Sequence, residues 1–565
     1  LIPLRRYFVA QEHGKLPFPE AVATTQILVS GESGGKGAIV LVYSIIVGGI
    51  YDFLVEALHA WPKMLRSDML LGGWGANLAK NTRMVLKLNA QAALFGLGYI
   101  VGIKYASIIA AGSVLSFLVL VPLVYFIGQH APGVFPPGDI PIGQMDELAV
   151  FSSYVQKIGI GAIAMAGIIG IIKLGKVIVS SFSVGIREII RGAKGESGGH
   201  PRTDTDMDMK FVMLLLIGTL LLTLIAFYFF AEPVGGTGFV ILTALVGLLI
   251  IAVLAFLFTP VAARAIAIIG VNPVSGMTLI TLIIASIVLV SIGVSGEPGM
   301  IVALIMGAVI CTALSTSGAF ISDLKIGYWI GSTPQKQQHW KFLGIVVASI
   351  SVSLALLLIQ KSYGFTIGGS ILEGGVPNPA IPAPQGNLMA VIIKSLMIES
   401  QIPYLLYGIG ALVALLLEMA GVPPLAFALG MYLPIQINLP VFVGGVVSWL
   451  VGKKKVEGGA EEQEGSADTP KGRGTLIASG FIAGGALMGV VGAFLNLPDI
   501  GKPIRFISIG VNYVREYVPE TDSYVWMIGE HANYFDSIAG QIISFIGFIG
   551  LCLFTYFYAT AVKKK

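Results

Sequence analysis

Long windows of apolar residues without charge recur along the whole chain, and they decide which solvent the folded protein needs. Residues 274–296 and 419–452 contain no Asp, Glu, Lys or Arg. A helix needs about 20 apolar residues to cross roughly 30 Å of hydrocarbon, so both windows are long enough. Only 12% of all residues are charged, whereas a soluble domain has about 25%. Lipid is therefore expected to cover most of the surface.

These windows predict an all-α, polytopic integral membrane protein with about 13–14 transmembrane or half-spanning helices. Each window should be helical, because only helices and closed barrels satisfy their own backbone hydrogen bonds in lipid. The sequence shows none of the short alternating blocks that are typical of a barrel. The windows are 38–57, 88–104, 105–128, 149–180, 211–231, 236–258, 274–294, 300–318, 341–360, 386–399, 403–420, 423–447, 474–495 and 540–561.

Basic residues beside the windows predict the orientation. The loops 187–210, 321–341 and 453–473 and the C-terminal residues 563–565 are rich in Lys or Arg. Even numbers of windows separate these regions, so all four fall on one side. Since Lys and Arg are enriched in cytoplasmic loops, we expect these regions to be cytoplasmic in a multi-pass protein of the cell membrane.

The topology of residues 58–128 stays open. Residues 58–87 carry five basic residues, yet the count of windows places them outside. We expect 88–128 to contain a broken or re-entrant element around Gly96, Gly98 and Gly102, which would make the count wrong there.

The chain divides into a transmembrane half at 1–320 and a second half at 321–565, with 453–473 as a charged, Gly-rich flexible linker inside the second half. The first residue is Leu1 rather than Met, and we expect the first spans of the complete protein to be missing.

One internal echo is compatible with an inverted repeat. Residues 161–170 resemble residues 480–489 at an offset of 319, which also aligns Gly102 with Gly421 and Ala111 with Gly430. Small residues are common where membrane helices pack, so chance explains the echo equally well.

Three polar interruptions of apolar windows predict where a substrate binds. Transporters bind substrate on discontinuous helices near the middle of the membrane. The strongest interruption is 421–445, where four prolines and polar side chains predict two half-helices that meet near Tyr432. The alternatives without a role in binding are capped helix starts and surface loops. The candidate substrate-binding residues of the three interruptions are Asn272, Ser275, Thr278, Gln385, Asn387, Tyr432, Gln436 and Asn438.

Carboxyl groups within apolar windows predict where a proton binds. Charges in the membrane are disfavoured and usually serve a pathway, a relay or a buried pair. We expect Glu418, or else Glu399, to carry a coupling proton. Asp52 and Glu56 share a helix face, but Glu56 is expected to lie at the end of its span. Of the six histidines, only His13 stands out from the loops.

Other classes of protein are disfavoured. The sequence has no HExxH motif, no paired aspartates within windows and no His/Cys cluster, so we expect neither an enzyme nor a resident cofactor or metal. Nothing suggests nucleic-acid binding. A channel fits the composition, but broken helices suit a gated binding site better.

Beyond these local features, six short strings follow one another along the chain. They are Arg5-Arg6 with Glu12-His-Gly-Lys-Leu-Pro-Phe-Pro-Glu20; Gly98-Tyr-Ile-Val-Gly102; Asn272-Pro-Val-Ser-Gly-Met-Thr278; Ser322-Asp-Leu-Lys-Ile-Gly-Tyr-Trp-Ile-Gly-Ser-Thr-Pro334 with Gln337-Gln338; Pro384-Gln385 with Leu388-Met-Ala390; and Pro424-Leu-Ala-Phe-Ala-Leu-Gly-Met-Tyr-Leu-Pro434 with Pro440-Val-Phe-Val-Gly-Gly445. In these strings and their order, the chain resembles prokaryotic-type members of the oligopeptide transporter (OPT) family, which includes the yellow stripe-like metal-chelate transporters.

The resemblance implies a symporter, driven by a proton gradient without a cofactor, that imports small oligopeptides by alternating access. Import of metal chelates, such as siderophore-like or nicotianamine-like complexes, is the alternative that the family leaves open. About sixteen helices are implied for the complete protein. The partners implied are the substrate and the lipid bilayer, and the oligomeric state stays open.

Overall fold

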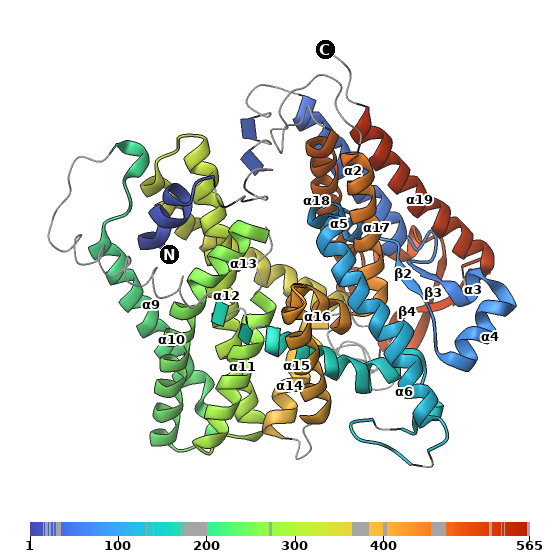
Figure 1. Ribbon diagram of the computed structural model, residues 1–565, viewed down its shortest axis with the longest axis horizontal. Helices are drawn as coiled ribbons and strands as arrows, with labels where there is room; N and C mark the ends of the chain where they lie inside the picture. Colours follow the sequence, from blue (N-terminus) through green and yellow to red (C-terminus); the bar gives the residue numbers. More distant parts are fainter. Residues whose placement is uncertain are drawn as a thin grey trace. The chain divides into compact units, whose positions relative to one another are not determined.

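Helices dominate the computed structural model of this protein (Figure 1). Among the residues that the structure describes, ten helices are long and apolar enough to cross a membrane, and two shorter apolar helices accompany them. This confirms the predicted all-α, polytopic membrane fold. The described residues are 1–14, 16, 18, 21, 24–25, 28–29, 36–131, 133–138, 140–166, 168–169, 172–173, 201–269, 274–363, 384–398, 404–453, 470–518, 523–532, 534–535 and 537–561.

The chain forms two compact units, and each is built from segments that are distant in sequence. Unit 1 contains residues 1–25, 163–347 and 383–404, and unit 2 contains residues 26–162, 348–382 and 405–565. Each unit contains residues from both sides of position 320, where the predicted halves meet, and the predicted division stays a prediction. Contacts join residues 1–25 to residues 163–347 in unit 1, and residues 405–565 to residues 26–162 in unit 2.

Unit 1 is a bundle of long apolar helices that lie side by side (Figure 1). Met306, Ile310 and Leu314 follow one another at a spacing of four, so they share one face of α12, and all are fully buried. This face packs on α10 and α11; in lipid, such packing is held mainly by van der Waals contacts. The helices are α9 (Met209–Phe230), α10 (Thr237–Ile269), α11 (Val274–Ser291), α12 (Gly296–Trp329), α14 (Pro384–Met397) and α13 (Pro334–Tyr363), which ends in unit 2.

Unit 2 combines spanning helices with two small hairpins of strands. Its long helices are α2 (Lys36–Glu56), α5 (Ala92–Val114), α17 (Ile435–Gly452), α18 (Pro470–Leu495) and α19 (Ile538–Thr560). Its shorter helices are α3 (Ser67–Leu70), α4 (Gly72–Thr82), α6 (Val121–Gly128), α7 (Glu147–Val150), α15 (Tyr404–Met419) and α16 (Pro424–Tyr432). The segment that α7 opens continues as a span to Ala166.

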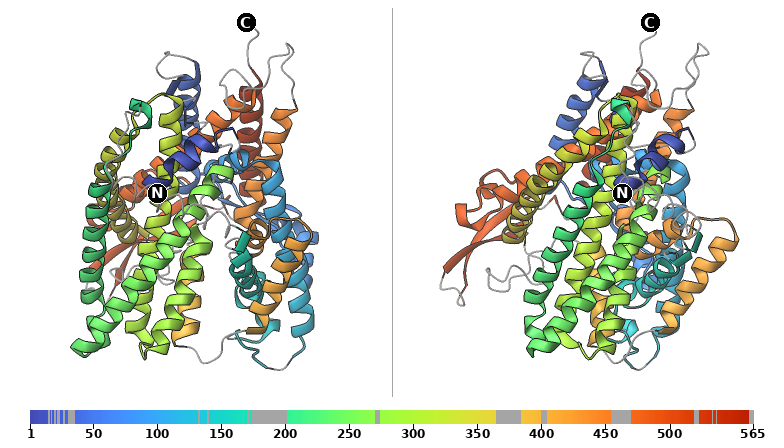
Figure 2. Two further views of the ribbon diagram at one scale, coloured as in Figure 1. Left: turned by 60° about the vertical axis from the view of Figure 1, so that its left-hand side comes forward. Right: turned by 90° about the vertical axis from the view of Figure 1, so that its left-hand side faces the viewer.

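Both hairpins lie outside the spans. Strands β1 (Met64–Arg66) and β2 (Lys87–Asn89) pair antiparallel, with Leu65 opposite Leu88. Strands β3 (Val511–Val518) and β4 (Ser523–His531) also pair antiparallel, and their hairpin projects away from the helices (Figure 2). The two hairpins lie at the same end of unit 2, because the Gln541 side chain at the start of α19 accepts from the Arg66 amide at 3.0 Å, and the Ile509 amide donates to the Leu58 carbonyl.

The segment 92–128 is re-entrant: its two ends return to the same end of unit 2. A straight helix from residue 92 to residue 125 would be about 50 Å long. Yet the ammonium of Lys87, just before α5, forms an ion pair of 2.5 Å with Glu147, at the start of α7. The guanidinium of Arg83 also lies 4.6 Å from the centre of the Tyr125 ring. The helix turns at Gly102, whose φ is +76°.

A re-entrant segment of this kind was predicted from the sequence, but its expected effect on the count of spans does not follow. A segment that returns to its starting side leaves the parity as two full crossings would. Residues 58–91 and 129–146 therefore lie on one side. The basic residues that seemed misplaced in 58–87 are mostly paired: Lys63 with Glu56, Arg66 with Asp68 at 2.7 Å, and Lys87 with Glu147. Partial burial would raise the pKa of Asp68, but the hydrogen bonds and charge of Arg66 outweigh it and lower this pKa.

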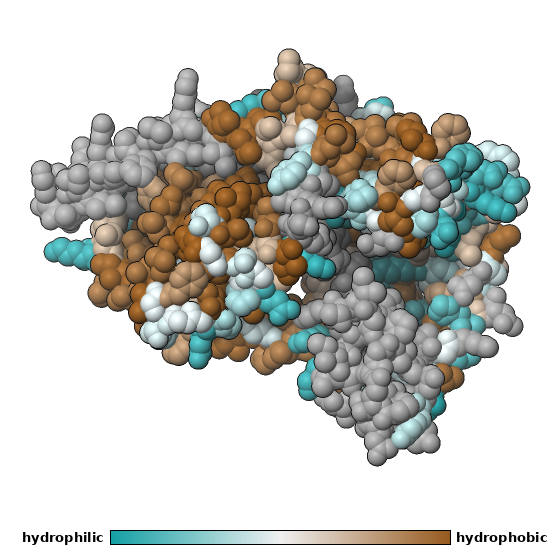
Figure 3. Space-filling view, turned by 90° about the horizontal axis from the view of Figure 1, so that it is seen from below, coloured by the Kyte–Doolittle hydropathy of each residue, from teal (hydrophilic) through white to brown (hydrophobic). Residues whose placement is uncertain are grey.

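Apolar side chains cover much of the exterior, as expected for contact with lipid. Only 6% of the spanning window in α9 is buried, and none of the window in α13 is. Brown, hydrophobic residues cover wide areas of the face in Figure 3, with teal residues gathered in places. In water such a surface would be an aggregation liability, so the fold needs a bilayer around it.

The structure bears differently on three predicted segments. Most of the predicted loop 321–341 is helical, because α12 runs to Trp329 and α13 begins at Pro334. The window 423–447 is two helices, α16 and α17, as predicted. Of the predicted linker 453–473, residues 454–469 lie outside the described part of the chain, and α18 begins at Pro470.

The re-entrant course of 92–128 predicts a specific cross-link. In a background that lacks Cys311 and Cys552, Lys87→Cys with Glu147→Cys should form a disulfide or a short bis-maleimide cross-link, detectable as a mobility shift on a gel. Lys87→Cys with Arg473→Cys is the matched control. Arg473 lies at the other end of α19, where it contacts Ala561, about 30 Å from Gln541. Cross-linking of the control pair, without cross-linking of the test pair, would contradict the re-entrant course.

Candidate functional site

Helix α16 ends and α17 begins at Leu433–Pro434, inside an otherwise apolar segment. Pro434 has no amide hydrogen to continue a helix, and Leu433 adopts an extended conformation with ψ +140°. Pro440 interrupts the backbone hydrogen bonds of α17 a second time. Backbone that breaks at membrane depth is tolerated where it is buried in protein or lines a cavity. The sequence prediction of two half-helices that meet near Tyr432 is confirmed.

A second broken helix, α5, crosses α16 and α17, and both segments carry the same motif. Phe95-Gly-Leu-Gly98 and Phe427-Ala-Leu-Gly430 both read Phe-x-Leu-Gly, and aligning them sets a fixed offset between the two segments. A Cβ atom at Gly98 would collide with the Val441 carbonyl, and one at Gly430 would collide with the Ile109 carbonyl. The same offset aligns Ile109 with Val441, so the two contacts are reciprocal.

Reciprocal contacts are what a two-fold relation between the segments produces. A second pair obeys the same rule: Gly112 meets the Phe427 carbonyl and Gly444 meets the Phe95 carbonyl. The crossing is therefore built like the inverted repeats of secondary transporters. The offset of 319 that the sequence suggested is wrong for these two segments, because their contacts relate Gly102 to Pro434 rather than to Gly421.

Polar side chains fix the break between α16 and α17. The Asn438 amide nitrogen donates to Ser113 Oγ at 2.6 Å and to the carbonyls of Gly430 and Leu433, both at 3.3 Å. Ser113 Oγ in turn donates to the Gly430 carbonyl at 2.8 Å. Asn438 is 2% exposed. Its donors therefore satisfy carbonyls that the break leaves free, so Asn438 positions the site and does not present its donors to a substrate.

The other two predicted residues of this segment lie on either side of the break. Tyr432 is 1% exposed, and its carbonyl accepts from the Gln156 side chain at 3.4 Å. The buried side-chain oxygen of Gln436 accepts no hydrogen bond from any residue that the structure describes. Burying an acceptor without a partner is costly. Gln436 is therefore the predicted residue best suited to accept a hydrogen bond from a bound molecule.

Lys104 is a further candidate residue that the windows did not indicate, because it falls at the edge of a window. It lies two residues beyond the Gly102 break, and its side chain is exposed beside the Tyr105 ring. Charged side chains within spans usually face a water-filled path or the interior of the bundle rather than lipid. The offset between the two Phe-x-Leu-Gly motifs aligns Lys104 with Gln436, and this alignment could have found it.

The remaining predicted binding residues belong to the segments of unit 1. Thr278 is buried in α11. Ser275 also begins α11, and Gln385 and Asn387 begin α14, but their side chains lie outside the described part. Asn272 and Glu399 lie outside the described residues altogether. The structure thus brings Tyr432, Gln436 and Asn438 together and does not test a grouping with the others.

The structure places one of the two carboxyl groups that were predicted to carry a proton. Glu418 lies half-buried in the last turn of α15, and its role stays a prediction. Asp52 is 4% exposed, within the span that α2 forms. The sequence paired it with Glu56 on one helix face without giving it a role.

The family strings that contain Arg5 and Gln338 meet in a buried charged cluster of unit 1. Arg5 is 1% exposed and binds Asp206 through two bonds of 2.5 and 2.9 Å and Asp204 at 2.7 Å. Gln338 donates to Asp206 at 2.6 Å. Removal of a partner from such a cluster is strongly destabilising, so Arg5 and Gln338 stabilise unit 1.

Lys325 is another buried charged residue of unit 1. It is fully buried and donates to the Val9 carbonyl at 2.7 Å and to His13 Nδ1 at 2.9 Å, near the rings of Phe18, Tyr328 and Trp329. His13, the one histidine singled out from the sequence, is therefore part of this contact.

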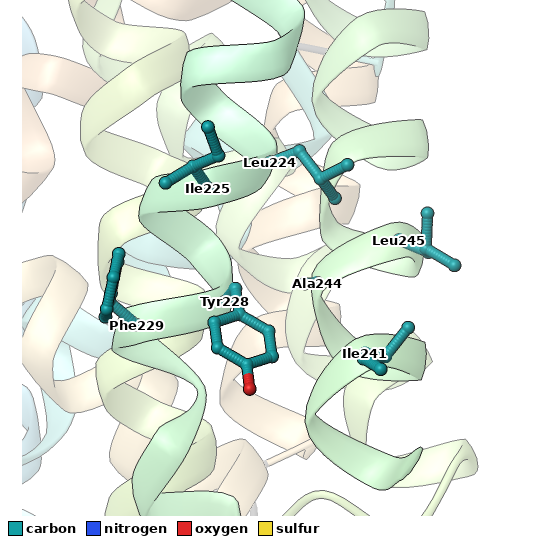
Figure 4. A pocket seen from close by; sticks show the side chains of 7 residues that line it. All are labelled: Leu224, Ile225, Tyr228, Phe229, Ile241, Ala244 and Leu245. Carbon is teal, nitrogen blue, oxygen red and sulfur yellow. The ribbon is translucent and has the colours of Figure 1, made fainter. Parts of the chain in front are cut away.

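A groove of about 330 Å³ lies between α9 and α10 (Figure 4). Its lining is apolar, with the Tyr228 hydroxyl as the polar group among Leu224, Ile225, Phe229, Ile241, Ala244 and Leu245. A peptide or chelate needs several converging polar groups, so this groove suits a lipid chain and not a transported substrate. Among the described residues, no group of three or more His, Cys, Asp or Glu could hold a metal ion.

The bundle of spans and the crossing of two broken helices define a class, the membrane transporters with discontinuous helices. Comparison with known proteins gives the family. The description "OPT oligopeptide transporter protein" matches residues 1–496, so the chain belongs to the OPT family of transporters. A protein of Haemophilus influenzae that bears the name "Putative oligopeptide transporter" is 27% identical over 524 residues, which are 87% of this chain and 78% of that protein.

The glycine contacts at the crossing predict equal sensitivity at two distant positions. Gly98→Val and Gly430→Val should each push the helices apart and lower the midpoint of thermal unfolding in detergent by several degrees, since overpacking costs about 1–3 kcal/mol. Gly408→Val is the control, because no described atom lies within 4 Å of a Cβ atom at that helical position. Equal midpoints for all three variants would contradict the close crossing.

Proposed function

We propose that this protein is a proton-coupled symporter that imports small oligopeptides across the cell membrane by alternating access. The observation that carries the proposal is the crossing of α5 with α16 and α17. Two broken segments with reciprocal contacts offer freed backbone groups and polar side chains along one crossing. Membership in the OPT family supports transport, and the crossing supplies the kind of site that secondary transporters use.

Peptide recognition at this site would rely on groups that all peptides share. The free acceptor of Gln436 suits a peptide N–H group, and the exposed ammonium of Lys104 suits the terminal carboxylate. The predicted residues of unit 1, Thr278 with Asn272, Ser275, Gln385 and Asn387, remain further candidates. Binding through backbone and termini would let one site accept peptides with different side chains.

Proton coupling needs a carboxyl group that binds and releases a proton during the cycle. Glu418 and Glu399 are the groups that the sequence predicts for this role. The basic loops 187–210, 321–341 and 453–473 and the C-terminus are proposed to be cytoplasmic. The end of unit 2 that holds residues 58–91 then faces outward, so a proton from outside enters there.

Uptake into liposomes tests the function directly. With an inward gradient of one pH unit, and one proton carried with each peptide, the purified protein should concentrate a labelled tripeptide about tenfold. Collapse of the gradient with a protonophore should return the ratio to one. Uptake that only equilibrates under the gradient would contradict coupling. Accumulation of a labelled iron chelate without tripeptide uptake would favour the metal-chelate alternative.

Lys104 predicts a dependence on the peptide terminus. Lys104→Gln should raise the KM for a tripeptide with a free carboxylate about tenfold, the value of one charge-assisted hydrogen bond, and should leave the KM of the amidated peptide unchanged. Lys80→Gln, on the exposed surface of α4, is the control and should change neither. An equal effect of Lys104→Gln on both peptides would rule out a contact with the carboxylate.

A further inference from the structure

We propose that Asp52 is the residue whose protonation couples the proton gradient to movement of the re-entrant helix α5. The inference rests on the proposed function and names a coupling residue that differs from the predicted Glu418. It follows from where the carboxylate lies and which backbone groups it holds.

Asp52 links three helices of unit 2, of which α5 belongs to the crossing. It lies one turn inside the end of α2 and is 4% exposed. Its two oxygens accept from the amides of Ala92 at 2.7 Å and Ala93 at 3.2 Å, which open α5. On the third side, a Cβ atom at Gly485 of α18 would collide with the carboxylate. The carboxylate is therefore enclosed by α2, α5 and α18, and it holds the first turn of the re-entrant segment.

The described cation near Asp52, Lys63, is engaged by another carboxylate. Glu56, one turn outward on α2, contacts both Lys63 and Gln91. The ammonium of Lys63 is therefore bound to Glu56 and not to Asp52. Tyr51 is the other titratable neighbour on α2, while Ala92, Ala93 and Gly485 bring no charge from α5 and α18. Two carboxylates at i and i+4 repel each other when both are ionised, which favours a proton on the buried one.

The half-buried groups outside Asp52 provide a route for the proton. The side chains of Lys63 and Glu56 are 35% and 34% exposed, and they lie between Asp52 and the end of unit 2 that carries the hairpins. A proton that enters at this end passes Glu56 and reaches the Asp52 carboxylate.

Protonation of Asp52 weakens the hydrogen bonds that hold the first turn of α5. An ionised carboxylate only accepts, and it favours the positive end of a helix. Once protonated, Asp52 loses its charge, and one oxygen becomes a hydroxyl donor, so the amides of Ala92 and Ala93 are held less firmly. Gly102 and Lys104 lie further along α5. A movement of the first turn of α5 therefore also moves these residues of the proposed substrate site.

A purely structural cap makes a different prediction, which Asn distinguishes. Asn and Asp cap helix starts about equally well, but Asn cannot bind a proton. Asp52→Asn should therefore fold and bind peptide, yet lose coupling. Asp146→Asn is the matched control, because Asp146 also accepts from a backbone amide at a helix start, that of Ala149 at 2.7 Å, but is exposed.

The experiment compares two activities of the same purified proteins in liposomes. The first is tripeptide accumulation under an inward gradient of one pH unit, and the second is counterflow of labelled against unlabelled tripeptide without a gradient. Asp52→Asn should lose the roughly tenfold accumulation and keep counterflow within about twofold of the unsubstituted protein, with no dependence on pH from 5 to 8. Asp146→Asn should accumulate and exchange as the unsubstituted protein does.

The other outcomes overturn the inference. If Asp52→Asn accumulates peptide normally, or if Glu418→Gln alone abolishes accumulation and spares counterflow, the coupling residue lies elsewhere while the proposed function stands. If folded Asp52→Asn loses counterflow as well, Asp52 has only a structural role. If Asp52→Asn aggregates in detergent, Asp52→Glu is tested in its place. Asp52→Glu should still accumulate peptide, with a shifted pH midpoint of accumulation. An unshifted midpoint overturns the proposal. If the unsubstituted protein ignores the gradient, the proposed function itself fails.

Discussion

The close approach of α5 to α16 and α17 is the contact on which the rest of unit 2 depends. Backbone can touch backbone there because Gly98, Gly112, Gly430 and Gly444 leave no Cβ atom in the way. In lipid the hydrophobic effect does not drive helices together, so small residues and polar contacts must do so. Because the contacts are reciprocal, each broken helix packs on the other through the same motif.

Breaking two helices within the membrane has a cost, because free carbonyls and amides there need partners. Asn438 and Ser113 satisfy the carbonyls beside the break in α16 and α17, and Asp52 holds the amides that open α5. The groups that stabilise the crossing are thus the groups through which a substrate or a proton can change it. Gln436 and Lys104 are left with free capacity beside the breaks, which is why we assign recognition to them.

The sequence predicted the class of fold because the bilayer imposes a strong rule on composition and helix length. It also predicted the break near Tyr432, since Pro434 has no amide hydrogen with which to continue α16. It missed Lys104 and gave Asp52 no role, because both depend on which helices meet, and contacts between segments far apart in the chain leave little trace in local patterns. Asn438 was predicted to bind substrate on residue type alone, whereas its partners are the Ser113 hydroxyl and two protein carbonyls. The motif shared by residues 95–98 and 427–430 was visible in the sequence, but only the contacts show that it relates the two segments.

The central claim is that substrate binds at the crossing of α5 with α16 and α17, and photolabelling tests it most directly. A tripeptide that carries a photoreactive side chain would be cross-linked to the protein in liposomes, and the labelled residues would be identified by mass spectrometry, with excess unlabelled tripeptide as competitor. Our account predicts competed labels within residues 97–113 and 430–445. Competed labels confined to the groove of α9 and α10, with none at the crossing, would contradict it.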